Sequence, residues 1–161
     1  MNRVLSLAAG TVLDAGPAGT LRAAADAGYD AAGLRLDPQD AGATGLRALA
    51  DDLGLAVLDL EVARLGPDTR FADHLRLLEL AQELGARFLL AVSVHPDPAA
   101  TADELGRLAA AAEGGPTRVA LEFMRFTRVG TLDEAVDVAT AASAVVLVDA
   151  LHLARGGDTP D

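Results

Sequence analysis

The sequence contains no cysteine and no tryptophan, and aromatic residues make up only 3% of its 161 positions. Without cysteine, neither a disulfide framework nor a thiolate metal site can form. This agrees with a reducing cytoplasm, where we expect the protein to be located. Hydrophobic residues still make up 51% of the chain, so its core must be built from alanine, valine and leucine. A chain of this length is expected to form one domain over residues 1–161.

Basic residues and long apolar runs are also scarce. Lysine and arginine together number 13 against 24 acidic residues, which gives a net charge of −11. Phosphate binding needs clustered basic side chains, so this charge argues against nucleic-acid partners and against an anionic membrane surface. No apolar run approaches the roughly 18 residues of a membrane span. The N-terminal apolar run resembles a signal peptide only faintly, because Asp14 interrupts it early.

Six short apolar runs alternate with amphipathic segments rich in alanine and leucine, about one pair per 27 residues. The runs predict strands at residues 4–9, 31–36, 56–63, 87–92, 118–123 and 144–148. The amphipathic segments predict helices at residues 19–28, 44–54, 73–85, 100–115 and 131–142. Strands that alternate with helices imply a parallel sheet with right-handed crossovers.

Local signals mark the helix ends. Glycines at positions 28, 54, 85 and 114 follow four of the predicted helices and are expected to cap their C-termini. Thr131 and Glu134 have the spacing of a capping box at the start of the last predicted helix.

The strand pattern distinguishes a barrel from a doubly wound sheet. In the predicted strand at 56–63, Leu58, Leu60 and Val62 alternate with Asp59, Glu61 and Ala63. A doubly wound sheet is covered on both faces and should be apolar at both parities, whereas a barrel has one polar face at its mouth. No G-x-G-x-x-G follows the first strand. We therefore expect an α/β fold, a partial (β/α) TIM-type barrel of about six βα units with parallel strands.

Glu122 lies within the apolar segment "RVALEFMRF". Burying a carboxylate is costly unless it is paired or metal-bound, so Glu122 is a candidate site residue. A purely structural alternative is a buried ion pair with Arg35 or Arg125.

Asp149 ends the sixth predicted strand, and His152 follows in what we expect to be a loop. Carboxylate oxygen and imidazole nitrogen together suit Mn²⁺, Zn²⁺, Fe²⁺ or Co²⁺, and Glu122 lies at the same expected end of the sheet. The alternative to a metal site is that Asp149 is only a capping residue and that His152 is a solvated histidine.

Arginines and a glutamate also lie near strand ends, namely Arg35, Glu61 and Arg64. They are candidates to bind substrate hydroxyls or a phosphate, or to form a charge network around the mouth. Arg155 is a further candidate for substrate binding on a loop that Gly156 and Gly157 make flexible, with a mobile tail as the alternative.

Two other histidines are expected to have no role in the site. We expect His95 to lie exposed on a loop and His74 to lie on a helix surface.

The chain resembles the sugar phosphate isomerase/epimerase group of xylose-isomerase-like barrels, which also includes zinc-dependent AP endonucleases. The segments that carry the resemblance include "LDLEVARLGPDT", "VALEFMRF" and "VLVDALHLARGGDTP". The resemblance implies a divalent metal at the barrel mouth, with Glu122 and Asp149 as ligands. Mn²⁺ is the expected metal, with Zn²⁺, Co²⁺ and Mg²⁺ as alternatives. It also implies that Glu122 is a catalytic acid or base and that His152 contacts the substrate and takes part in catalysis.

This resemblance implies eight strands, and the sequence provides six. The histidine ligand of a seventh strand and the glutamate of an eighth have no counterpart among the 161 residues. The resemblance therefore predicts a truncated sugar or sugar-phosphate isomerase/epimerase that moves a proton next to a carbonyl. Alternatives are a non-catalytic remnant, a half-enzyme completed by a partner chain and, less favoured, an AP-endonuclease-like metal hydrolase. Two unpaired sheet edges also favour a homo-oligomer.

Overall fold

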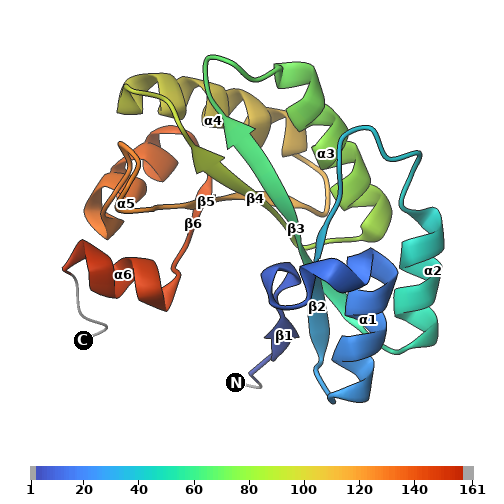
Figure 1. Ribbon diagram of the computed structural model, residues 1–161. Helices are drawn as coiled ribbons and strands as arrows, with labels where there is room; N and C mark the ends of the chain where they lie inside the picture. The colour runs from blue at the N-terminus through green and yellow to red at the C-terminus, as the bar shows by residue number, and fades with distance from the viewer. Residues whose placement is uncertain (1–2, 158–161) are drawn as a thin grey trace.

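The computed structural model describes residues 3–157 and contains six parallel strands that form one curved sheet (Figure 1). The strands are β1 (Ser6–Leu7), β2 (Ala31–Arg35), β3 (Ala56–Leu65), β4 (Phe88–Ser93), β5 (Arg118–Glu122) and β6 (Val145–Leu147). Each predicted strand is confirmed, with ends that differ by a few residues. The last residues of the final sequence motif, from position 158 on, lie outside the described residues.

Helices connect the strands. They are α1 (Gly16–Asp26), α2 (Thr44–Asp52), α3 (Phe71–Leu84), α4 (Pro98–Ala112), α5 (Leu132–Ala141) and α6 (Ala150–Gly156), with the short 3₁₀ helices η1 (Ala9–Thr11) and η2 (Leu13–Ala15) before α1. Helices α1 to α5 follow the convex side of the sheet in Figure 1. Within residues 3–157, no helix is long and apolar enough to cross a membrane.

The strands lie in the sheet in chain order, and each pairs in parallel with the next. Among the described residues, β1 and β6 are the edges of this sheet, so the barrel stays open between them. The structure thus confirms the predicted partial barrel of parallel strands. Since parallel strands point the same way, all their carboxyl ends meet at one rim of the sheet.

The core lies between the sheet and its helices and consists mainly of leucine, alanine and valine. Leu34, Leu60, Leu89 and Leu121, one from each central strand, are fully buried. Burying a leucine side chain contributes about 1.5–3 kcal/mol, so this layer supplies the main driving force that holds helices on the sheet. The aromatic-poor composition is therefore compatible with a continuous core.

The predicted alternation in β3 is wrong at Leu58 and beyond Leu60. One extra residue interrupts the pairing of β3 with β2, and another interrupts its pairing with β4 between Leu60 and Ala63. The fully buried residues of the strand's second half are consequently Leu60, Ala63 and Leu65, not Val62. Such bulges redirect side chains locally, and here they place Glu61 and Val62, two successive residues, in the lining of one cavity.

The helix ends agree closely with the local sequence signals. The four expected capping glycines all have positive φ angles, between 68° and 77°. The capping box is present, with the Thr131 hydroxyl accepting from the Glu134 N–H and the Glu134 carboxylate accepting from the Thr131 N–H.

Helix α6 was not expected from the sequence, which predicted a loop after β6. It spans seven residues, and Asp149 is its N-cap. A helix of two turns is too short to show a clear hydrophobic periodicity, so the sequence pattern alone could not distinguish it from a loop.

Replacing Thr131 by alanine should lower the free energy of unfolding by about 1 kcal/mol, because the N-cap hydroxyl would no longer accept a hydrogen bond from the first turn of α5. Urea denaturation followed by circular dichroism measures this change. Thr140→Ala on the exposed face of the same helix is the matched control. It should leave stability unchanged or slightly raised. Equal losses in both variants would contradict the capping role.

Candidate functional site

A cavity of about 280 Å³ lies on the inner side of the sheet, and we call it the mouth cavity. Its polar lining consists of Arg35, Asp59, Glu61, Arg64, Glu122 and Asp149, and its apolar lining includes Leu90, Val92, Met124 and Leu147. These side chains come from strands β2 to β6 and from the segments that follow β5 and β6. Five residues that the sequence singled out therefore line one cavity, whereas His152 and Arg155 are not part of its lining.

Glu122, the last residue of β5, is half-buried in this cavity. The ion pair with Arg35 or Arg125 that we weighed as an alternative is not present. Arg35 instead pairs with Glu61 at 2.5 Å, and Arg125 donates to the Gly156 carbonyl at 3.0 Å. Burial raises the pKa of the Glu122 carboxyl, an effect that His152 opposes and that Asp149 and Glu61 reinforce.

Asp149 and His152 are joined through the start of α6. The Asp149 Oδ1 accepts a hydrogen bond from the backbone N–H of His152 at 2.9 Å. Asp149 therefore caps α6, as the alternative interpretation of this residue predicted, and uses one of its two carboxylate oxygens to do so. The His152 ring contacts Phe126 edge-on, with centroids 6.0 Å apart. Its Nδ1 atom is buried without a hydrogen-bond partner among the described residues. The prediction of a loop at His152 is wrong.

Arg155 was also predicted to lie on a flexible loop, and this is wrong as well. It lies in the last turn of α6, where its side chain is exposed. A cation at this end of a helix interacts favourably with the carbonyl groups of the final turn.

Asp59 was not among the predicted site residues, yet it is the most perturbed carboxyl group in the cavity. Burial, together with the neighbouring charges of Glu61 and Glu122, raises the pKa of Asp59 to about 7. Its Oδ1 atom is buried without a hydrogen-bond partner among residues 3–157. A Cβ atom at Gly33 would collide with that oxygen, so the glycine makes room for the carboxylate. The signal available in the sequence was its position two residues before Glu61, on the same strand face.

The predictions that His74 lies on a helix surface and that His95 is exposed are wrong, although His95 does lie on a loop. His74 is buried, and its Nε2–H donates to the Arg64 carbonyl at 2.9 Å. Its Nδ1 lies 3.2 Å from one oxygen of Glu104, whose other oxygen lies 2.6 Å from Nε2 of the half-buried His95. Glu104 thereby connects α3 to the loop after β4, behind the end of β3.

A second cavity of about 580 Å³, which we call the side cleft, adjoins the mouth cavity. The two share Arg35, Val62 and Arg64 in their linings. The charged lining of the side cleft consists of Arg35, Asp37, Arg64, Asp68, Arg70 and Asp73. A ligand in the mouth cavity can therefore extend past Arg64 into the side cleft.

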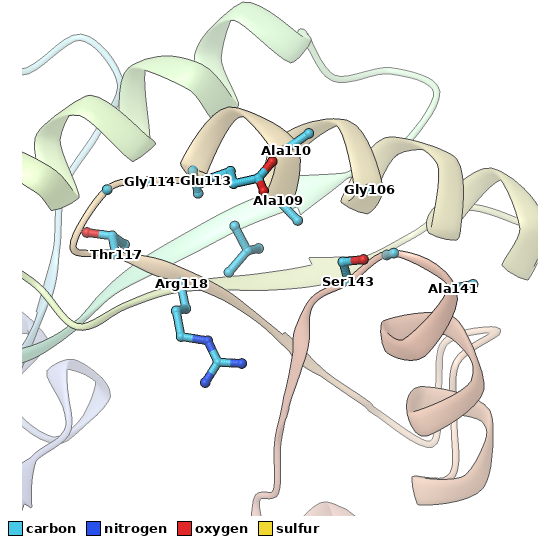
Figure 2. Close-up of a pocket in the computed structure, with 13 residues that line it drawn as sticks. Gly106, Ala109, Ala110, Glu113, Gly114, Thr117, Arg118, Ala141 and Ser143 are labelled. Atoms are coloured by element: carbon cyan, nitrogen blue, oxygen red, sulfur yellow. The ribbon is translucent and has the colours of Figure 1, made fainter.

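Figure 2 shows a cavity of about 460 Å³ at the opposite end of the sheet, where β5 begins and α4 and α5 end. Alanine and glycine make up most of its lining. Its buried hydroxyl, on Thr117, already donates to the Ala86 carbonyl at 2.7 Å. This cavity offers few groups for chemistry, in keeping with the structural role of that end of a (β/α) barrel.

The mouth cavity fits a divalent cation only in part. Glu122 and Asp149 line the same cavity, and carboxylate oxygens suit Mg²⁺ and Mn²⁺. Burial is the main cause of the raised pKa of Glu122, and a cation between the two carboxylates would also relieve the smaller contribution from the charge of Asp149. Within residues 3–157, however, no three histidine, aspartate or glutamate side chains are arranged to hold a metal ion. Among the described residues, only the two carboxylates Glu122 and Asp149 remain as candidate ligands for such an ion.

Comparisons with known proteins place this geometry in a family. The model of the family described as xylose isomerase-like TIM barrel matches residues 21–161. No curated protein gives a significant match.

Three solved structures illustrate the likeness of the fold. A D-allulose 3-epimerase from Methylomonas sp. in complex with D-allulose is 18% identical, with a TM-score of 0.67 over 92% of this chain. A probable 3-DHS dehydratase, AsbF from Bacillus anthracis, is 14% identical, with a TM-score of 0.68 over 98%. A xylose isomerase-like TIM barrel protein from Mycobacterium smegmatis in complex with magnesium is 20% identical, with a TM-score of 0.59 over 80%. The chain spans 62%, 67% and 54% of their lengths, respectively.

Replacing Asp59 by asparagine should stabilise the protein at neutral and alkaline pH. Because the pKa of Asp59 is raised to about 7, the folded state binds a proton that the unfolded state releases near pH 4. The resulting penalty for the native protein is absent below pH 4, grows as the pH rises and is complete above about pH 7. We expect a gain in unfolding free energy on the order of 3 kcal/mol at pH 8 that vanishes at pH 4.

Urea denaturation at several pH values measures this gain. Asp52→Asn, at an exposed position at the end of α2, controls for the loss of one negative charge. A constant gain from pH 4 to pH 8, or a gain as large for Asp52→Asn, would rule out the buried carboxyl as its cause.

Proposed function

Because the chain belongs to the xylose isomerase-like TIM barrel family, we propose that it forms most of a divalent-metal-dependent sugar isomerase or epimerase. The observation that carries this proposal is the gathering of Glu122, Asp149 and Glu61 in one cavity at the carboxyl ends of the strands. One structural neighbour is named a sugar epimerase and another a dehydratase, so the fold alone does not select the reaction. Family membership and the carboxylate-rich mouth together favour proton transfer next to a carbonyl.

Glu122 is proposed as the acid or base that moves the proton. A carboxyl group whose pKa burial raises is a stronger base than a fully solvated one, and it returns the proton more readily near neutral pH. Among residues 3–157, no arginine pairs with it, so its oxygens stay available to a substrate. This matches a reaction in which one carboxylate removes a proton from the carbon beside a carbonyl and later returns one.

A divalent cation held by Glu122 and Asp149 would supply Lewis-acid polarisation of the substrate carbonyl oxygen. The second oxygen of Asp149 is available for this, because only Oδ1 accepts the His152 N–H. Mn²⁺ is the proposed ion, and the magnesium complex of a structural neighbour supports Mg²⁺ as an alternative. Remaining ligands must come from groups other than the described carboxylates.

Substrate hydroxyls are proposed to bind the polar groups around the carboxylates. The Arg35–Glu61 pair presents donors and an acceptor at one wall of the mouth cavity, and Arg64 adds further donors. His152 is proposed to contact substrate from α6, where its buried Nδ1 has no partner among the described residues. Arg155 is exposed at the end of the same helix and remains a weaker candidate for substrate binding.

An alternative function is that of a half-enzyme whose site a partner chain completes. Exposed apolar side chains near both open edges of the sheet favour it: Val4 and Leu5 beside β1, and Val148 and Leu151 beside β6, are each more than half exposed. Two further strands between these edges would cover them and could bring the missing ligands. A non-catalytic barrel that binds metal weakly is a third reading.

Glu122→Gln and Asp149→Asn should each abolish stoichiometric Mn²⁺ binding, because each removes one of two carboxylate ligands. Isothermal titration calorimetry with Mn²⁺ measures this directly. Where ketose 3-epimerase activity is present, Glu122→Gln should lower its rate roughly a hundredfold or more, as expected for loss of a general acid or base.

Glu113→Gln, at an exposed position after α4, is the matched control and should leave metal binding and rate unchanged. If the purified chain neither binds a divalent metal nor turns over any ketose, the enzymatic role of this chain fails and the non-catalytic reading stands.

The half-enzyme alternative predicts that the chain self-associates through its open edges. Light scattering coupled to size exclusion should give a mass above that of one chain, and Leu5→Ser with Val148→Ser should shift it toward the monomer. Val136→Ser, on the exposed side of α5, is the control. A monomer at all concentrations would argue against association through the edges.

A further inference from the structure

The side cleft has a balanced set of charges. Its lining contains three arginines, Arg35, Arg64 and Arg70, and three aspartates, Asp37, Asp68 and Asp73. The mouth cavity next to it is richer in acids, and the whole chain carries a net charge of −11. A ligand that enters the side cleft therefore meets positive and negative side chains in equal number, within an overall negative field.

Some of these groups already form hydrogen bonds or ion pairs within the protein. Arg35 pairs with Glu61 at 2.5 Å, and the Asp37 Oδ1 accepts the Gln39 N–H at 2.9 Å. The Arg64 carbonyl is held by the buried His74, which fixes the backbone at the point where the two cavities meet. These contacts hold part of the cleft lining in place around the end of β3.

Other side chains in the cleft remain available. Among residues 3–157, the side chains of Arg64 and Arg70 form no hydrogen bond or ion pair, and the same holds for Asp68 and Asp73. Two donor groups and two acceptor groups are thus free to bind a ligand. A hydroxyl group both donates and accepts, so a chain of neighbouring hydroxyls satisfies both kinds at once.

A phosphate ester fits this lining poorly. It carries up to two negative charges and offers mainly acceptor oxygens. The arginines could pair with it, but three aspartates would oppose it, and the free acceptors of Asp68 and Asp73 would lose their water without gaining a donor.

We propose that the side cleft binds the hydroxyl-bearing tail of an unphosphorylated sugar whose carbonyl end lies in the mouth cavity. This inference rests on the proposed function and narrows its substrate class from sugars and sugar phosphates to neutral sugars. Arg64 lines both cavities, and its side chain has no partner among residues 3–157, so it can position the middle of such a substrate. The cleft volume of about 580 Å³ lies within the range of small-molecule sites.

The test is a binding measurement that does not depend on turnover. Calorimetry or ligand-observed NMR at constant ionic strength compares D-fructose and D-tagatose with their 6-phosphates, and inorganic phosphate serves as a competitor. At least one neutral ketose should bind, its 6-phosphate should bind about tenfold more weakly or worse, and inorganic phosphate should not displace the sugar.

Variants localise the effect. Arg64→Gln should weaken binding of the neutral ketose about tenfold, through loss of a charge-assisted hydrogen bond. Asp68→Asn combined with Asp73→Asn should narrow or reverse the discrimination against the 6-phosphate, because two opposing charges are removed. Arg22→Gln, on the exposed side of α1, is the control and should change neither affinity.

Tighter binding of a 6-phosphate than of its parent sugar, displacement of the sugar by inorganic phosphate, or no binding of either neutral ketose would each overturn the inference. Binding of the neutral sugar without turnover supports the side cleft while counting against the proposed catalysis. Turnover of phosphorylated sugars without turnover of neutral sugars would support the proposed catalysis and count against the proposed role of the side cleft.

Discussion

The partial burial of four neighbouring carboxylates in the mouth cavity is the constraint on which the chemistry of this structure depends. Asp59, Glu61, Glu122 and Asp149 line one cavity of about 280 Å³, and only Glu61 has an arginine partner within ion-pair distance among the described residues. Burial first, and the charges of neighbouring carboxylates second, raise the pKa values of Asp59 and Glu122. A fold that retains such a cluster keeps carboxylates with raised pKa values, which are good proton acceptors, at the open rim of its sheet.

The backbone of β3 and the absence of a side chain at Gly33 make this cluster possible. Extra residues in the pairing of β3 with both neighbours place Glu61 and Val62 in the lining of the cavity, while Ala63 and Leu65 pack into the core. Gly33, on the adjacent strand, leaves the space that the Asp59 carboxylate occupies. The irregular pairing of β3 and the glycine at position 33 thus allow residues of β3 to line both the mouth cavity and the side cleft.

The two ends of the sheet differ because parallel strands all point one way. The carboxyl ends of the strands line the mouth cavity and the side cleft, with their clustered charges, whereas alanine and glycine make up most of the lining of the cavity at the opposite end (Figure 2). Polar groups such as Thr117 at that end are satisfied by backbone carbonyls. This separation of chemistry from packing is the general arrangement of (β/α) barrels.

Local sequence patterns alone determined six strands, five of the helices and the cap at Thr131, because these depend on contacts within a few residues. The regular alternation of strands with helices then indicated their parallel arrangement. The local patterns also singled out Glu122 and Asp149, since a charge at the end of an apolar run is visible in the chain. Only the tertiary structure decided that Asp59 is buried without a partner and that Glu104 joins His74 to His95. Those outcomes depend on strand register and on side chains far apart in the sequence, which no local pattern encodes.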